Sequence, residues 1–168
     1  MELMRETPND GWEVEALYDS CFAPGRTALS SYRLREGVPP ARELCLLVRG
    51  DADEVAGAIR FWPIKVGDHG AMLLGPVAVH PTHQGEGLGA LLIQAGLDRA
   101  RVAGVARVLL VGDAPYYGRF GFERLHGVQM PPPTNPDRIL GCWDWDGVRG
   151  PVTRAPLPNA APVPILGP

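Results

Sequence analysis

The chain has 168 residues, 45% of them hydrophobic and 21% charged, which suits one globular domain with a buried core. Its formal net charge of −3 gives no strong electrostatic attraction to nucleic acid or to an anionic membrane. The cysteines, Cys21, Cys45 and Cys142, are widely spaced and include no CxxC pair, which argues against a disulfide framework and a structural zinc site.

The N-terminal residues 1–10 are polar, unlike the apolar segment of a signal peptide. No uninterrupted apolar run approaches the roughly 18 residues that a membrane-spanning helix requires. We therefore expect a cytoplasmic protein whose partners include neither nucleic acid nor a membrane.

The first half of the chain predicts two helices followed by antiparallel strands. Asp10–Phe22 carries apolar side chains at helical spacing behind an aspartate that can cap the helix, and Arg26–Glu36 predicts a second, shorter helix. The apolar runs Glu43–Arg49 and Glu54–Val66 flank a Gly/Asp-rich turn, which predicts a β-hairpin. Ala71–Val79 predicts a third strand.

The second half predicts a strand–helix–strand crossover. Gly87–Ala103 is amphipathic at helical spacing, and Ala106–Val111 is a near-continuous apolar run typical of a strand buried on both faces. Pro115–Arg119 predicts a short helix and Ile139–Trp145 a last strand. The order of elements predicts an α/β (α+β) fold in which helices pack on a mixed sheet.

The composition changes after Gly147, where proline, glycine and alanine dominate. Proline lacks the N–H that a ladder or helix needs, so we expect this segment to form neither and to be loose or to wrap the domain as an irregular strap. The chain is thus predicted to consist of a domain over residues 1–146 and a tail over residues 147–168.

The segment Gly75–Gly89 predicts a strand, a turn, a glycine-rich loop and the start of a helix. Glycines before a helix let the backbone approach a ligand closely and turn several N–H groups the same way, and the helix N-terminus adds partial positive charge. Such a loop binds a phosphate or pyrophosphate without a lysine. The alternative is a loop whose glycines only turn the chain.

Two other phosphate-binding motifs compete for this loop. No Gly-Lys-Ser/Thr follows, which excludes the ATP-binding P-loop. Gly85-x-Gly87-x-x-Ala90 satisfies the dinucleotide fingerprint, with Asp113 at a later strand end. The insert His80–Gln84 before the first glycine, the short remainder of the chain and the antiparallel strands upstream argue against a nucleotide-dependent oxidoreductase.

The run Val79-His80-Pro81-x-x-Gln84-Gly85-x-Gly87-x-Gly89 resembles the acetyl-coenzyme A signature of the GNAT superfamily of N-acetyltransferases, whose core is Gln/Arg-x-x-Gly-x-Gly/Ala. A second block, Tyr116-Tyr117-Gly118-Arg119-Phe120-Gly121-Phe122, resembles the family's Phe/Tyr-Tyr-x-x-x-Gly-Phe ending. One helix and one strand separate the two blocks, as in the family. The resemblance covers most of Glu43–Phe122.

The resemblance implies a single GNAT-like domain in which Ala71–Val79 and Ala106–Val111 splay apart around the acetyl-coenzyme A cleft, with helices on both faces of the sheet. Gly75-Pro76 in mid-strand predicts either a bulge, which would free backbone groups for the pantetheine arm, or an edge strand. The coenzyme-binding residues implied are Val77, Ala78, Val79, Gln84, Gly85, Glu86, Gly87, Leu88, Gly89, Ala90, Tyr116 and Arg119. One N–H of residues 77–79 would also polarise the thioester carbonyl.

By the same resemblance, Tyr117 is the general acid for the coenzyme A sulfur, and a phenol with a pKa of about 10 keeps its proton at neutral pH. Many members of the family carry a glutamate on the strand before the loop, but Ala71–Val79 contains no carboxylate. Asp113 is therefore a candidate base or amine-binding group, and equally a candidate cap for the helix that begins at Pro115.

His80 and His83 have no cysteine or carboxylate at ligand spacing, so we expect no metal. Trp62, Trp143 and Trp145 are candidates to line an acceptor pocket or to lie in the core.

We therefore expect an N-acetyltransferase that transfers the acetyl group of acetyl-coenzyme A to a primary amine of a small-molecule or peptide acceptor, directly in a ternary complex. The missing carboxylate supports an alternative, a non-catalytic module that binds or senses acyl-coenzyme A. A homodimer is compatible with the sequence, which gives no direct sign of one.

Overall fold

The computed structural model describes residues 1–22 and 30–155. In the first half the elements are β1 (Glu2–Arg5), α1 (Gly11–Cys21), α2 (Ser30–Arg33), β2 (Leu46–Arg49), β3 (Val55–Val66) and β4 (His69–Val79). In the second half they are α3 (Leu88–Val102), β5 (Arg107–Val111), α4 (Ala114–Tyr117), β6 (Glu123–Arg124), β7 (Val128–Gln129), β8 (Ile139–Trp143) and β9 (Gly150–Arg154). In the described part of the chain, no helix is both long and apolar enough to cross a membrane.

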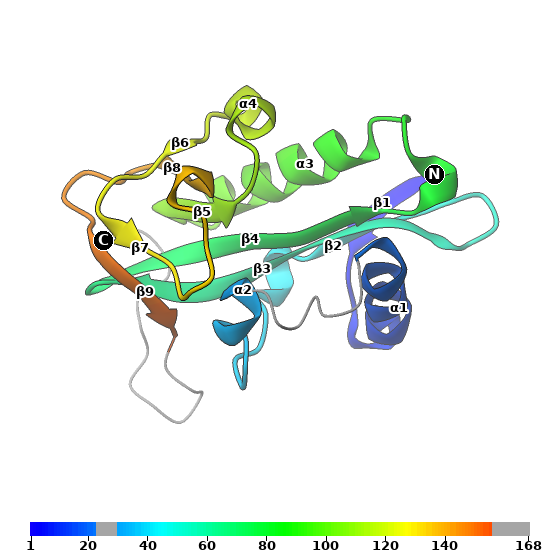
Figure 1. Cartoon of the computed structure of the whole chain (residues 1–168). Coiled ribbons are helices and arrows are strands. Elements are labelled where there is room, and N and C mark those ends of the chain that lie inside the picture. The colour runs from blue at the N-terminus through cyan, green and yellow to red at the C-terminus, as the bar shows by residue number, and fades with distance from the viewer. Residues whose placement is uncertain (23–29, 156–168) are drawn as a thin grey trace.

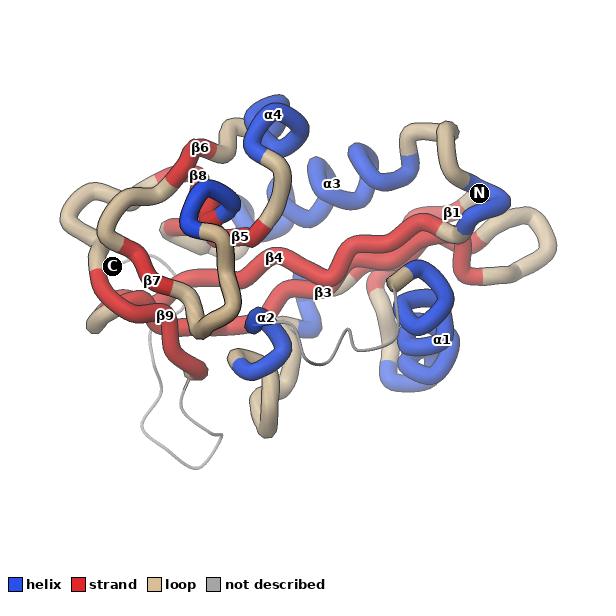
Figure 2. The backbone as a smooth tube through the Cα atoms, in the orientation of Figure 1, coloured by secondary structure: helices blue, strands red, loops and turns tan. Residues whose placement is uncertain are grey.

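The strands form one mixed sheet with helices on both faces, as predicted. The main strand order is β1-β2-β3-β4-β5-β8-β6, and the β4–β5 pair is parallel while its neighbours are antiparallel. Helix α3 covers one face, and α1 and α2 lie on the other (Figures 1 and 2). The crossover from β4 through α3 to β5 therefore places the end of β4 and the start of α3 at one edge of the layer.

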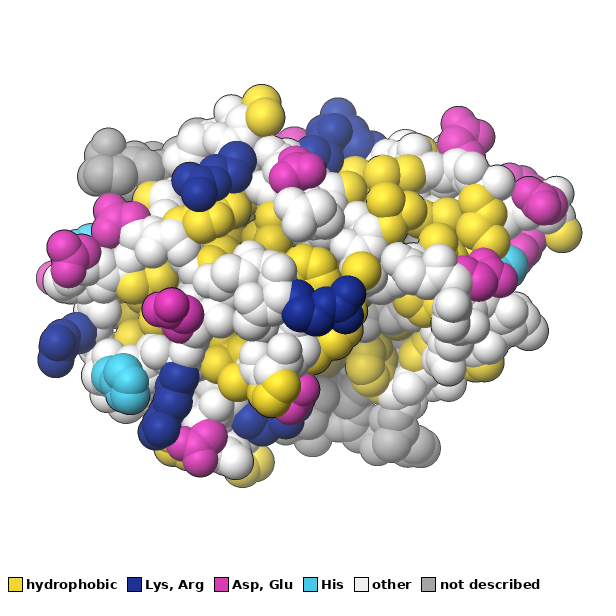
Figure 3. Space-filling model, turned by 90° about the horizontal axis from the view of Figure 1, so that it is seen from above, with side chains coloured by type: hydrophobic (Ala, Val, Ile, Leu, Met, Phe, Trp, Pro, Cys, Tyr) yellow, Lys and Arg dark blue, Asp and Glu magenta, His cyan; other side chains and the backbone are white. Residues whose placement is uncertain are grey.

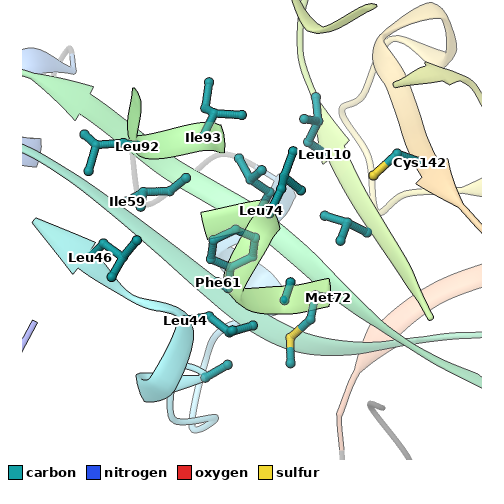
Figure 4. Close-up of a cluster of buried hydrophobic side chains, with 14 of the residues drawn as sticks. Leu44, Leu46, Ile59, Phe61, Met72, Leu74, Leu92, Ile93, Leu110 and Cys142 are labelled. Carbon is teal, nitrogen blue, oxygen red and sulfur yellow. The ribbon is translucent and has the colours of Figure 1, made fainter. Parts of the chain in front are cut away.

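The core divides along the two faces of the sheet because side chains alternate along each strand. Leu92 and Ile93 of α3 lie over Ile59 in a cluster that also includes Phe61, Met72 and Leu110 (Figure 4). On the other face, the buried side of α1 packs on the sheet; this cluster contains Val14, Leu17, Tyr18, Leu47, Val55, Ala58 and Ala78. The face above α3 shows basic and acidic side chains scattered among one another, without a continuous basic surface (Figure 3).

Strand β4 bulges at Gly75-Pro76 and then parts from β5. Ile59 pairs with Val77 and Phe61 with Leu74, so one residue of β3 opposes two of β4. Gly75 has a φ of 130°, in the region that favours glycine. The β4–β5 ladder contains only two pairs, which end at Leu73. The predicted bulge and splay are thus confirmed, and the edge-strand alternative is wrong because β4 lies between β3 and β5.

The predicted tail begins with a strand, which corrects the expectation that it joins no ladder. Strand β9 pairs antiparallel with β3 and parallel with β7. Pro151 has no N–H to donate, but it joins the ladder through its carbonyl, which accepts a hydrogen bond from the Gly67 amide at 3.1 Å. Residues 150–154 of the proposed tail are therefore paired with the sheet, residues 156–168 lie outside the described residues, and the domain boundary at residue 146 stays a prediction.

Two other expectations differ from the structure. The short strand β1, which pairs with β2, was not predicted, because its exposed, charged side chains lack an apolar alternation. The predicted helix Arg26–Glu36 is helical over Ser30–Arg33 and then turns, and residues 26–29 lie outside the described residues.

We expect that Val152→Ala lowers the free energy of unfolding by about 1–2 kcal/mol, because it removes buried methyl groups from the core. Val152 is 3% exposed and belongs to the core cluster beneath β9. Thr153→Ala, on the exposed side of the same strand, is the matched control and should change stability by less than about 0.5 kcal/mol. Equal effects in urea denaturation would show that β9 contributes no packing.

Candidate active site

The glycine-rich loop takes the backbone conformation that an anion-binding helix start requires. Gly85 and Gly87 have φ of 86° and 80°, and a Cβ at either would meet no atom within 4 Å. Gly87 is the N-cap of α3 and, as a glycine, offers no side chain to accept hydrogen bonds from the first turn. The amides of Leu88, Gly89 and Ala90 therefore point out of a 15-residue helix without a capping side chain.

The Gln84 side chain is hydrogen-bonded to the end of β4, where the loop begins. Its Nε2 donates to the Val79 carbonyl at 3.3 Å, and the His80 amide donates to the Ala56 carbonyl of the neighbouring strand at 2.8 Å. The His80 side chain stays within its own turn, where Nδ1 lies 2.8 Å from the Thr82 hydroxyl. The predicted coenzyme residue Gln84 thus has a visible role in holding the loop against β4.

His83 links the loop to the β2–β3 turn. Its Nε2 lies 2.8 Å from Oε1 of Glu54, and its Nδ1 lies 3.3 Å from Oε2 of Glu86. The hydrogen bond to Glu54, and then the one to Glu86, raises the pKa of His83 above its usual 6.5. In the described residues no group of three or more His, Cys, Asp or Glu is arranged to hold a metal ion.

We expect Glu54→Gln to lower the pKa of His83 more than Glu86→Gln does, because the hydrogen bond to Glu54 is the largest single cause of the raised pKa. A raised folded-state pKa means that the bridge stabilises the fold below pH 6.5 and fades as pH rises through that pKa. The histidine ring protons followed by NMR against pH measure both shifts, with His83→Gln to assign the resonance. Equal pKa values in all three proteins would contradict the bridge.

A cavity of about 170 Å³ lies where β4 and β5 part. Its walls include residues 73–77 of β4, Leu110 and Val111 of β5, and Tyr117. The rest of the lining comes from Phe22 and from Ser31, Tyr32 and Arg35, in and just after α2, so the cavity opens toward the α2 side of the sheet. Tyr117 of the second motif block and the Gly75-Pro76 bulge therefore line the same cavity.

Strand alternation limits which backbone groups of β4 face this opening. The His80 amide points to β3, where it bonds Ala56, so the polar groups of Ala78 also point to β3. Those of Val77 and Val79 point the other way, towards the gap. Of the three residues predicted to offer backbone groups, Val77 and Val79 therefore do so. The Val79 carbonyl already accepts from Gln84 and from the Cys21 thiol.

Tyr117 lines the gap from α4 and is held by close packing. A Cβ on Gly112 would lie 2.5 Å from its ring, so only glycine admits the ring at that depth. The Tyr116 and Phe122 rings meet it edge-on, at centroid distances of 5.0 and 6.1 Å. Burial raises the pKa of Tyr117 above its usual 10, which keeps the phenol protonated through the neutral range.

Tyr116 brings the two motif blocks into contact. Its hydroxyl lies 3.7 Å from the place where a Cβ on Gly89 would stand, and the Arg119 guanidinium carbon lies 5.2 Å from its ring centroid. The Tyr116 amide donates to a carboxylate oxygen of Asp113 at 3.1 Å. Asp113 thus caps α4, the structural role weighed for it from the sequence, and its role as a base stays a prediction.

A second cavity adjoins the first on the α2 side. Tyr32, Arg35 and Pro76 line both cavities, while Trp62 lines only the second. The remaining residues around the second cavity are Glu15, Glu36 and Arg60. Sequence reasoning named Trp62 for an acceptor pocket but missed Tyr32 and Arg35, since a short irregular helix gave them no motif.

Trp143 and Trp145 do not line either of these two cavities. They line a separate groove, with the Trp145 indole N–H donating to the Cys142 carbonyl at 2.9 Å. Trp143 stacks with Arg101, whose guanidinium carbon lies 4.4 Å from a ring centroid. Both tryptophans follow or end β8, on the far side of β5 from β4.

Comparison with known proteins agrees with this geometry. Residues 11–122 match the model of the acetyltransferase (GNAT) family. The uncharacterized N-acetyltransferase YhbS of Escherichia coli K12 is 33% identical over 120 residues, which cover 70% of this chain and 71% of that protein.

Two solved structures are also similar. That of YhbS from Escherichia coli in complex with CoA has a TM-score of 0.77 at 29% identity and covers 91% of this chain and 88% of its own. A GNAT family acetyltransferase from Brucella melitensis in complex with acetyl-CoA has a TM-score of 0.61 at 31% identity and covers 80% and 92%. The fold and the enzyme class predicted from the two motif blocks are confirmed, and the oxidoreductase alternative is wrong. This chain belongs to the GNAT family of acetyltransferases.

Proposed function

We propose that this acetyltransferase binds acetyl-coenzyme A in the gap between β4 and β5 and transfers the acetyl group directly to a primary amine of its acceptor. The observation that carries the proposal is the opening itself. Tyr117 lines its wall, the neighbouring Tyr116 reaches Gly89 in the first turn of α3, and a second cavity adjoins it at Tyr32, Arg35 and Pro76. We infer that the coenzyme reaches Tyr117 from the start of α3 and that the acceptor reaches it from the second cavity.

The coenzyme side follows from the groups that the loop leaves available. The proposed pyrophosphate site comprises residues 84–90, whose amides at the start of α3 suit two negative charges. Val77 and Val79 are proposed to bond the pantetheine arm, with Tyr116 and Arg119 beside it. The complexes of the two similar structures with CoA and with acetyl-CoA support the same ligand here.

The chemistry requires a neutral amine, stabilisation of an oxyanion and a proton for the departing sulfur. An amide of Val77 or Val79 is proposed to donate to the carbonyl oxygen as negative charge develops there. Tyr117 is proposed to donate a hydrogen bond to the sulfur. A thiol with a pKa near 8.5 gives a thiolate that is a weaker base than the Tyr117 phenolate, so full proton transfer from Tyr117 to the sulfur is uphill. If Tyr117 does give up its proton, the proton that the amine loses must restore the phenol.

Three carboxylates are proposed as candidates for the general base. Asp113 serves as a base only if its carboxylate leaves the cap of α4. Glu15 and Glu36 are the carboxylates around the acceptor cavity, and Glu15 lies 2.6 Å from Arg60 in an ion pair. Proton removal by one of these groups through water is compatible with their positions at the cavity rim.

Direct attack is favoured over an acyl-cysteine intermediate by the state of the thiols. Burial raises the pKa of Cys45 to about 11 and that of Cys142 to about 12, which leaves almost no reactive thiolate. Cys21 donates its S–H to the Val79 carbonyl at 3.4 Å. All three cysteines are free thiols, which also supports the proposed cytoplasmic location. The homodimer stays a prediction.

Calorimetry with acetyl-coenzyme A, with NAD and ATP as controls, tests the coenzyme side of the proposal. Micromolar binding of acetyl-coenzyme A alone is expected, and no binding would overturn the proposal. Release of free thiol in the presence of a panel of primary amines then tests transfer. Binding without turnover on any amine would favour the non-catalytic sensor, which the lack of a carboxylate on β4 supports.

A further inference from the structure

We propose that this enzyme also takes uncharged acyl groups of about four to six carbons from coenzyme A, and that it binds butyryl-coenzyme A more tightly than acetyl-coenzyme A. The inference rests on the proposed function and names the acyl-donor class of the same site. Its basis is the position, the lining and the size of the first cavity, the one that lies where β4 and β5 part.

The first cavity lies beyond the proposed place of the thioester. Tyr117, proposed to face the sulfur, and Val77, whose backbone faces the gap, both line it. Its other lining from β4 is residues 73–76, while neither of the two described residues after Val77, which are nearer to the start of α3, lines it. The β4–β5 ladder ends at Leu73, so the cavity ends where the two strands close. A coenzyme that arrives from α3 therefore has this cavity ahead of its thioester, on the side of the acyl chain.

The walls around this space are largely apolar. The strand residues that supply them include Leu73, Leu74, Leu110 and Val111, and the three leucines are each at most 5% exposed. Leu110 lies beside the Tyr117 ring, because a Cβ on Gly112 would stand 3.0 Å from a Leu110 methyl carbon and 2.5 Å from the ring. Such walls favour hydrocarbon, whose transfer out of water is favourable in proportion to the apolar area buried.

The volume of the first cavity exceeds what an acetyl group fills. It is about 170 Å³. For comparison, a cavity of about 150 Å³ lined by leucine, isoleucine and phenylalanine binds benzene, which has six carbons. An acetyl group extends only its methyl beyond the carbonyl carbon, whereas a butyryl chain extends three carbons and a hexanoyl chain five. Filling the space that acetyl leaves empty restores dispersion contacts to the apolar lining, which favours the longer chains.

The acceptor amine has a space of its own in the second cavity. The two cavities share Tyr32, Arg35 and Pro76, and the second is otherwise lined by Trp62 and three charged side chains, Glu15, Glu36 and Arg60. The acyl chain and the amine therefore meet at the carbonyl without competing for one space. The reaction stays the one proposed: the amine nitrogen bonds the carbonyl carbon, the carbon–sulfur bond breaks, and the proton that the amine loses restores the coenzyme A thiol.

Calorimetry on the full chain compares free coenzyme A with its acetyl, butyryl, hexanoyl and decanoyl thioesters, so that the test needs no knowledge of the acceptor. We expect butyryl-coenzyme A to bind about 10-fold tighter than acetyl-coenzyme A, because each buried methylene contributes about fourfold. The gain should stop before decanoyl, whose chain is longer than the cavity holds. The heat capacity change of binding should become more negative from acetyl to hexanoyl as more apolar surface is buried.

Substitutions at Val111 test whether the chain lies in this cavity. Val111 lines it from β5, so Val111→Phe narrows it and should abolish the advantage of butyryl over acetyl. Val111→Leu adds a single carbon and should remove part of the advantage, which keeps the comparison available if V111F folds poorly. Val102→Phe is the matched control: it makes the same change at a residue that is 91% exposed at the end of α3, and it should keep the wild-type ratio.

Three results would overturn the inference. The first is binding of butyryl-coenzyme A by the wild type that is no tighter than that of acetyl-coenzyme A. The second is a butyryl advantage that is unchanged in V111F and V111L, which would place the chain outside the cavity. The third is a gain that continues to decanoyl, as adsorption to an open surface would give. Failure of the wild type to bind coenzyme A or any of its thioesters would instead overturn the proposed function.

Discussion

Tyr117→Phe is expected to lower kcat by about 10²- to 10⁴-fold, the usual contribution of a positioned acid, and to leave the dissociation constant for acetyl-coenzyme A unchanged. The substitution removes one hydroxyl and keeps the ring, which packs on Gly112 and against Tyr116 and Phe122. A loss of kcat in this variant is therefore due to the missing hydroxyl and not to altered packing of the ring. Steady-state thiol release and calorimetry on the same preparations measure the two quantities.

Tyr116→Phe is the matched control, because Tyr116 precedes Tyr117 on the same short helix and its ring stacks on the same cluster. It should retain kcat within a few-fold. The pH profile adds an independent check: burial raises the pKa of Tyr117 above 10, so activity should show no loss from phenol ionisation between pH 7 and 9. Equal losses of kcat in the two variants would contradict a catalytic hydroxyl at Tyr117.

The sequence was most informative where chemistry and local geometry coincide. Gly85 and Gly87 have positive φ, a conformation that other residues adopt at a cost, so the loop was visible as a motif before its structure was known. Gly75-Pro76 likewise pointed to a bulge, because neither residue suits a regular central strand. In both places the residue type predicts the local backbone conformation directly.

Long-range contacts were less predictable. Strand β9 was missed because Pro151 disfavours a strand locally, although the edge of β3 offers it a partner that needs only its carbonyl. Arg35 belongs to no sequence motif, and its guanidinium contacts Tyr32 and Trp62, which come from different elements. The second cavity is lined by residues from several elements that only the tertiary fold brings together, so no single stretch of sequence predicts it.

Helix α1 also supports the site in a way that its sequence did not reveal. The Tyr18 hydroxyl donates to the Pro76 carbonyl at 3.1 Å, and the Cys21 thiol donates to the Val79 carbonyl at 3.4 Å. Both acceptors belong to the part of β4 that has left β5. The helix thereby satisfies carbonyl groups that lost their strand partner and holds the splayed segment in place.

Gly87→Ala is expected to weaken acetyl-coenzyme A binding by about 10- to 150-fold, the equivalent of one hydrogen bond to a charged group. A Cβ at Gly87 meets no protein atom within 4 Å, so the fold has room for it. The change acts on the left-handed conformation of the N-cap, with a φ of 80°, which non-glycine residues adopt at a cost of about 1–2 kcal/mol. Any relaxation of that conformation turns the first amides of α3 away from the pyrophosphate.

Gly104→Ala supplies a closely matched control for this prediction. Gly104 follows the other end of the same helix, has a φ of 82°, and also leaves open space where a Cβ would stand. Both variants should therefore lose similar stability in urea denaturation, while only Gly87→Ala loses affinity in calorimetry. Equal dissociation constants for the two variants would mean that the amides at the start of α3 do not bind the pyrophosphate, and the coenzyme would have to be placed elsewhere on the sheet.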